Sequence, residues 1–193
     1  MPKQKFMPRN LFLHSFILIF WGFGNSSLFA QTESDETVGS NSGLQLGTPA
    51  GFTLFHETPL SNRFALKAEA GLHASWAADN VYLNPAFSLE PRWYYNMGLR
   101  ANRGLNTRFN ASNYLYAFGS YRPDWLYGDS GSGDWNHFVL GAGWGMRRNI
   151  TERLYFELGL GIRKQFFFDS QNPDLPANLW FPHFHLRLGY RLF

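Results

Sequence analysis

The sequence predicts an all-β fold of antiparallel strands, because apolar and polar residues alternate repeatedly along the chain. In the segment 154–165, LYFELGLGIRKQ, most alternate residues are apolar, and those between them are mainly charged, polar or glycine. A period of two is that of a β-strand with one apolar face and one polar face. The chain also has no cysteine, and 19% of its residues are aromatic. If such a chain is exported, the absence of disulfides calls for another source of stability, and a closed membrane barrel is one.

The N-terminal residues 1–30 have the features of a cleavable signal peptide. Three basic residues precede the apolar stretch LFLHSFILIFWGF, and the small residue Ala30 lies at its exit. The alternative is a single membrane anchor, but the stretch is shorter than the roughly 20 residues that a spanning helix needs. We therefore expect a signal peptide over 1–30, a polar and flexible lead over 31–42, and a barrel over 43–193.

The charge of the chain gives no indication of a nucleic-acid partner. The formal charge is +3, and the three basic residues of the signal peptide account for all of it. From Gln31 onward, 14 Lys and Arg are balanced by 14 Asp and Glu. A near-neutral mature chain lacks the basic surface that nucleic acid requires, so binding to nucleic acid is not predicted.

Seven segments alternate with a period of two, those over 47–57 and 112–122 less regularly than the others. In chain order they are GTPAGFTLFHE (47–57), RFALKAEAGLHASW (63–76), FSLEPRWYYN (87–96), SNYLYAFGSYR (112–122), HFVLGAGWGMR (137–147), LYFELGLGIRKQ (154–165) and FHLRLGYRLF (184–193). Bacterial barrels have even numbers of strands, and eight is the smallest. The eighth strand is therefore expected between Thr37 and Leu46, with a turn near Thr48 and Pro49.

The polar faces favour a membrane barrel over a soluble one. The exposed face of a soluble barrel is usually rich in Lys, Glu, Thr and Ser. Here the polar face combines Gly, Arg, Glu and His of mixed size, as a crowded lumen requires. The apolar faces end in aromatic residues typical of membrane interfaces, namely Trp76, Trp93, Tyr95 and Tyr190. We therefore predict an antiparallel, transmembrane up-and-down β-barrel of about eight strands in the cell outer membrane, in contact with its lipid and lipopolysaccharide.

Three parts of the chain resemble a known group of proteins. They are similar to segments of small outer-membrane β-barrel proteins of the Bacteroidetes type, which have the OmpX/OmpA-like eight-stranded architecture. The similar strings are LEPRWYYN with the later NASNYLY, GMRRNITERLYFELGLGIR, and the C-terminal LRLGYRLF. The resemblance covers about residues 43–193, and it contains no motif diagnostic of an activity. It implies that the terminal Phe193 is read by the barrel-assembly machinery, although Arg191 replaces the aromatic residue usual two positions earlier.

Nine charged residues fall on the face predicted to line the lumen. They are Lys67, Glu69, Glu90, Arg92, Arg147, Glu157, Arg163, Arg187 and Arg191. An eight-stranded barrel has room inside for side chains and little else, and buried charges must be paired. The prediction is a plugged barrel with a structural or surface-interaction role, and the alternative is a narrow channel for ions or small solutes. We also expect the lumen-facing Gly159 to tolerate serine better than the lipid-facing Leu158 tolerates arginine.

Charge is expected to segregate between the two ends of the barrel. The connections assigned to the outer end are AADNVYLN, PDWLYGDSGSGDW and FDSQNPDLPANLW. They contain no Lys or Arg and an acidic rim of six residues: Asp79, Asp124, Asp129, Asp134, Asp169 and Asp174. The connections at the other end contain Arg100, Arg103, Arg108 and Arg148. The acidic rim is expected to attract divalent cations, although aspartate also simply favours turns.

Three chemical alternatives have weaker support in the sequence. His183 and His185 share the predicted lumen face with His137, and three imidazoles can bind zinc or copper; no cysteine accompanies them, so neither a metal nor a cofactor is predicted. A lipid A-modifying enzyme needs His, Ser and Glu together on the outside of the barrel, whereas Glu157 is predicted to point inward. Enzymatic activity is therefore not predicted. The glycines of GAGWG open no helix, which argues against a phosphate loop.

Overall fold

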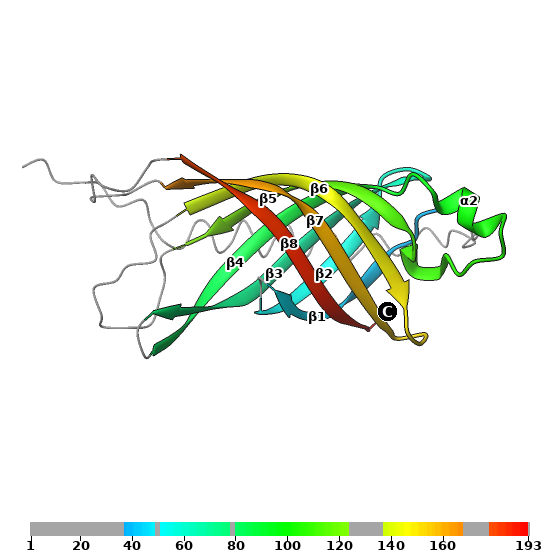
Figure 1. Cartoon of the computed structure of the whole chain (residues 1–193). Helices are drawn as coiled ribbons and strands as arrows, with labels where there is room; N and C mark the ends of the chain where they lie inside the picture. Colours follow the sequence, from blue (N-terminus) through cyan, green and yellow to red (C-terminus); the bar gives the residue numbers. More distant parts are fainter. Residues whose placement is uncertain (1–36, 49–50, 78–79, 124–136, 168–177, 193) are drawn as a thin grey trace, which may run out of the picture. The chain divides into compact units, whose positions relative to one another are not determined.

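The computed structural model describes residues 37–48, 51–77, 80–123, 137–167 and 178–192. Eight strands form a closed antiparallel barrel, in which each strand pairs with its neighbour in the chain and β8 pairs with β1 (Figure 1). The strands are β1 (Asn41–Thr48), β2 (Gly51–Pro59), β3 (Phe64–Ala77), β4 (Asn80–Trp93), β5 (Asn113–Arg122), β6 (His137–Asn149), β7 (Leu154–Phe167) and β8 (Asn178–Arg191). The predicted all-β, up-and-down barrel of eight strands is confirmed.

The strand that the sequence pattern left unplaced is β1. It covers Asn41–Thr48 and joins β2 on one side to β8 on the other, so it closes the barrel. The expected turn near Thr48 is confirmed, since β2 begins at Gly51. The lead predicted over 31–42 extends too far, because Val38 is buried and Asn41 already belongs to β1. The predicted signal peptide lies outside the described residues.

One predicted outer connection is largely strand. AADNVYLN was expected to be a loop, but β3 continues to Ala77 and β4 begins at Asn80, with Ala77 opposite Asn80 in the register. Asp and Asn gave the segment the composition of a loop, whereas the following Val and Tyr are good strand formers.

The connection between β4 and β5 contains two short helices that the sequence did not predict. They are α2 (Met97–Ala101) and the 3₁₀-helix η2 (Arg108–Asn110). Phe109 and Asn110 both have positive φ, 57° and 63°, a conformation that costs energy for residues other than glycine. The Asn110 side chain offsets this cost by exchanging two hydrogen bonds with the backbone of Gly39. No helix in the described part of the chain is long and apolar enough to cross a membrane.

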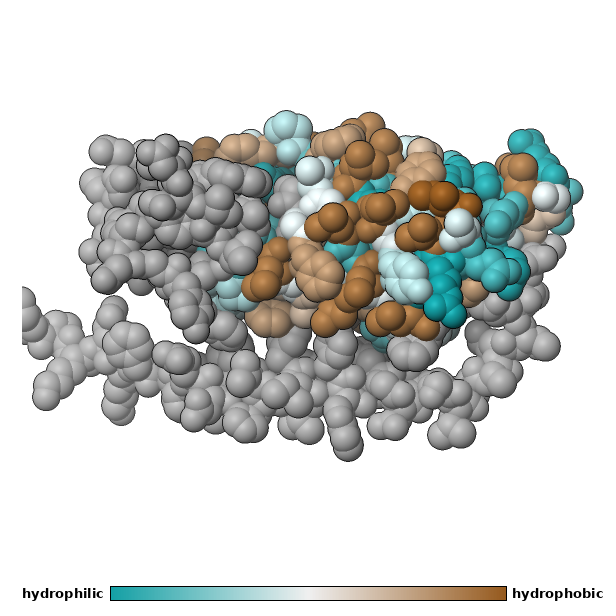
Figure 2. Space-filling model, turned by 90° about the horizontal axis from the view of Figure 1, so that it is seen from below, coloured by the Kyte–Doolittle hydropathy of each residue, from teal (hydrophilic) through white to brown (hydrophobic). Residues whose placement is uncertain are grey.

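Apolar side chains point outward from every strand. Twelve of them, with exposed fractions between 43% and 61%, are Leu46, Phe52, Leu54, Leu72, Leu89, Leu115, Leu140, Leu160, Ile162, Phe184, Leu186 and Leu188. We call this set the apolar band. Figure 2 shows apolar residues gathered over one side of the barrel wall, with hydrophilic residues at the end that carries α2. The inward positions of six of these strands hold the buried charges.

Candidate functional site

Four cations and four carboxylates form one ion network inside the barrel. They are Lys67, Arg92, Arg147 and Arg187 with Glu57, Glu69, Glu90 and Glu157, and none is more than 8% exposed. Six of the eight strands contribute a charged side chain to the network. These side chains face inward because every second residue of a strand points to the same face. Equal numbers of opposite charges make this lumen network neutral, as buried ions require.

Glu157 is the centre of the lumen network. Its Oε1 lies 2.8 Å from Arg92 Nη1 and 2.5 Å from Arg147 Nη2. Its Oε2 lies 3.5 Å from Lys67 Nζ and 3.6 Å from Arg187 Nη1. Glu157 therefore contacts all four cations, whereas Glu57, for example, contacts only Arg92 and Arg147.

Neutral side chains complete the hydrogen bonding of these charges. The Tyr94 hydroxyl donates to Glu57 Oε1 at 2.5 Å. Gln45 accepts a hydrogen bond from Lys67 Nζ at 2.6 Å and donates to Glu157 Oε2 at 3.1 Å. The Arg92 guanidinium lies 4.2 Å from the centroid of a further buried ring, that of Tyr114, which adds a cation–π contact. The middle of the lumen is therefore filled by interacting side chains.

Seven of the nine charged residues predicted for the lumen belong to this network. The other two lie towards opposite ends of the barrel. Arg191 donates to the backbone oxygen of Glu152 and to the side chain of Asn149, whereas Arg163 lines a cavity at the far end. Prediction from the sequence missed Glu57. The signal was present, because Glu57 is two positions from the buried Phe55 in β2, but an aromatic residue on the lumen face obscured the alternation.

The comparison of Gly159→Ser with Leu158→Arg stays a prediction, but Gly159 is more crowded than the alternation indicates. A Cβ at this position would collide with the imidazole of His185, which is fully buried and has no room to move. Other inward glycines have the same role, since they lie against large rings of the lumen and a side chain would overpack it. Those that lie against tyrosine are Gly143, Gly145 and Gly189.

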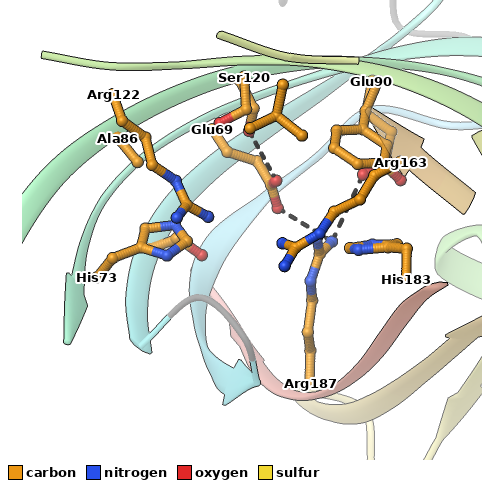
Figure 3. A pocket seen from close by; sticks show the side chains of 13 residues that line it. Glu69, His73, Ala86, Glu90, Ser120, Arg122, Arg163, His183 and Arg187 are labelled. Atoms are coloured by element: carbon orange, nitrogen blue, oxygen red, sulfur yellow. Dashed lines mark hydrogen bonds and ion pairs between the residues drawn. The ribbon is translucent and has the colours of Figure 1, made fainter. Parts of the chain in front are cut away.

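A small cavity lies beyond the network, towards the end of the barrel from which β5 leads to β6 and β7 leads to β8. Its volume of about 40 Å³ is enough for about three water molecules. We call it the lumen cavity. Its wall includes His73, Arg122, Arg163, His183 and Arg187 together with Glu69 and Glu90 (Figure 3).

The histidines considered as metal ligands lie inside the barrel. His183 Nε2 is 3.3 Å from His185 Nδ1, and both rings pack on Tyr116. His137 begins β6 and is also buried. Among the described residues, no three His, Asp or Glu side chains are grouped so as to hold a metal ion.

The structure describes the predicted charge segregation at one end of the barrel, the end that was expected to carry the arginines. Arg100 lies in α2 and Arg108 in η2, and Arg148 is near the end of β6, so these cations share the end that carries the β4–β5 connection. All six aspartates of the acidic rim lie outside the described residues.

No protein-family model matches this chain, and comparisons with curated proteins and with solved structures find no match. Function is therefore inferred from the two surfaces of the barrel, the apolar exterior and the charged interior.

Proposed function

We propose that this protein is an integral outer-membrane β-barrel with a plugged polar lumen, and that its role is structural or a surface interaction. The observation that carries the proposal is the inverted polarity of the barrel, with fully buried charges inside and the apolar band outside. A soluble monomer rarely exposes large apolar side chains on every strand of its wall, as this barrel does. A bilayer, in contrast, requires an apolar exterior and a closed sheet without unpaired edges.

Aromatic residues border the apolar band at the end that carries α2. Trp93, Tyr95 and Tyr190 are exposed there, with fractions of 41%, 38% and 39%. The two tyrosine hydroxyls also accept hydrogen bonds. Tyr95 accepts one from Trp144 Nε1 at 2.8 Å, and Tyr190 accepts one from Arg153 at 3.0 Å. Side chains with an apolar ring and a polar tip favour the membrane–water interface, which supports a membrane boundary at this level.

The connections support an orientation in the membrane. The short turns over 60–63 and 150–153, the start of β1 and the end of β8 lie at the same end of the barrel. In bacterial outer-membrane barrels the longer loops face the cell surface. The long connections that follow β5 and β7 leave from the opposite end of the barrel, where the turns after β1 and β3 are short. We therefore place the acidic rim, which lies in the opposite connections of the sequence, at the cell surface. Its expected contacts are divalent cations and the phosphates of lipopolysaccharide.

The interior favours a plugged barrel over the two alternatives. Arg92, Arg147 and Glu157 occupy the lumen with at most 1% exposure, which supports a lumen filled by side chains at this level. Phe109 adds a backbone oxygen that accepts hydrogen bonds from Asn41 and Arg147 at one end. A lipid A-modifying site needs a base on the outer face, whereas Glu157 is held inside by four cations. We therefore propose a role without enzymatic activity.

Planar-bilayer recording tests the plugged lumen. The protein refolded into bilayers is expected to show no stepwise conductance above that of the bare membrane, because the lumen network fills the pore. A large porin inserted under the same conditions provides the control for sensitivity. Regular single-channel openings of the purified protein would contradict the proposal and favour the narrow channel.

A further inference from the structure

Arg163 is an inward-facing cation that does not belong to the neutral lumen network. Its guanidinium lies 5.6 Å from the ring centroid of Phe181, and none of the ion pairs among the described residues includes it. Its Nε is buried without a hydrogen-bond partner in the described part of the chain. Arg163 as a whole is half-buried, and it is the buried Nε that is costly to leave without a partner.

His183 provides a second, independent observation on the wall of the same cavity. The residue is 6% exposed, and its Nδ1 is buried without a hydrogen-bond partner among the described groups. Its other ring nitrogen is occupied by the contact with His185. Figure 3 shows the His183 ring and the Arg163 guanidinium directed into one space. Buried polar atoms of this kind are normally satisfied, so a bound group is expected there.

The two carboxylates on the cavity wall are already engaged by the network. Glu69 lies 2.6 Å from Lys67 Nζ and 3.3 Å from Arg187 Nη1. Glu90 lies 2.7 Å from Arg92 Nη2 and 3.6 Å from Arg187 Nη1. Neither carboxylate therefore compensates the charge of Arg163.

We propose that the lumen cavity binds a small oxyanion, phosphate or sulfate, either free or as the terminal group of a larger molecule. Guanidinium groups such as that of Arg163 bind phosphate oxygens through paired N–H donors, and Arg122 adds a second positive charge to the same wall. An N–H on His183 Nδ1 and the hydroxyl of Ser120 supply further donors. The cavity volume of about 40 Å³ suits an ion of this size and excludes a drug-sized organic ligand.

Titration calorimetry of the detergent-refolded full chain with inorganic phosphate and with sulfate tests this site. Saturable binding of one anion per barrel is expected, and Arg163→Gln should weaken it by about tenfold or more because a charge-assisted contact is lost. Lys164→Gln is the matched control. Lys164 follows Arg163 on β7 but faces outward, with its ammonium over the rings of Phe166 and Trp180. This variant removes the same charge without altering the cavity, so its affinity should stay within about twofold of wild type.

Each outcome decides the proposal. Absence of saturable binding to the wild type, or equal weakening in the Arg163 and Lys164 variants, would overturn it. Binding that appears only after Asp124, Asp129 and Asp134 are replaced by Asn would also overturn it, because the chain's own carboxylates would then be the natural partners. Binding of phosphate but not of glucose 1-phosphate would identify the free ion, whereas binding of both would identify a terminal phosphate group. The titration needs no bilayer, so its failure and a failure of the membrane proposal are distinguishable.

Discussion

Replacement of Glu157 by glutamine is expected to lower the free energy of unfolding by about 3–5 kcal/mol, since it removes the charge of a buried ion while leaving its partners in place. Glu157 contacts all four cations of the lumen network, with distances from 2.5 to 3.6 Å. The variant would leave four cations against three carboxylates in the buried centre of the lumen. Urea unfolding of the refolded barrel, followed by tryptophan fluorescence in lipid vesicles, measures the change.

The matched control is Glu152→Gln. Glu152 lies in the β6–β7 turn with 87% of its side chain exposed, and it pairs with Arg108 at 4.0 Å. Exposed pairs of this kind contribute about 0–1 kcal/mol, so this variant should unfold almost as wild type does. An equal loss of stability in the two glutamine variants would show that the lumen network does not stabilise the barrel more than an exposed ion pair does.

Arginine in place of Leu160 is expected to cost about 2–4 kcal/mol of folding free energy in bilayers, because it would put a charge in the middle of the apolar band, which we propose to be in lipid. Leu160 lies in the central part of β7, opposite Trp144 and Phe184, and 53% of it is exposed. In a soluble barrel the same change would be neutral or favourable. The measurement is the free energy of unfolding in vesicles of defined thickness.

Ile150→Arg is the control for this second prediction. Ile150 is 56% exposed and lies in the turn before β7, beside Arg148 and Arg153. The substitution should cost less than about 1 kcal/mol if the turn lies outside the hydrocarbon. Equal effects at positions 150 and 160 would contradict a bilayer around the apolar band.

The fold could be predicted from the sequence where the two faces of a strand differ in polarity. In β7 and β8, glycine and charged residues alternate with apolar ones, and this contrast identifies the face of each strand that lines the lumen. The pattern is weaker in β5, where Tyr114 and Tyr116 are buried in the lumen. Hydropathy does not distinguish a lumen-filling aromatic residue from one at a membrane interface.

The partners within the lumen network could not be predicted from the sequence. Glu57 and Arg147 form an ion pair at 2.7 Å although they are far apart in the chain, and the contact exists only because β1 closes the barrel. The pairing of inward residues depends on the stagger of eight strands, a global property that no single segment contains. For the same reason, the collision between a side chain at Gly159 and His185 could not be anticipated from the alternation.

Cysteine labelling in membranes tests most directly the central claim that the apolar band lies in lipid. The chain has no cysteine, so Leu160→Cys and Ile150→Cys each introduce a single thiol, at positions exposed by 53% and 56% in the barrel itself. Outer-membrane fragments of expressing Gram-negative cells, open on both faces, would be treated with a membrane-impermeant maleimide before and after denaturation. We predict that the thiol at position 150 reacts in the intact membrane and that the thiol at position 160 reacts only after denaturation. Equal reactivity of the two thiols in the intact membrane would contradict the account.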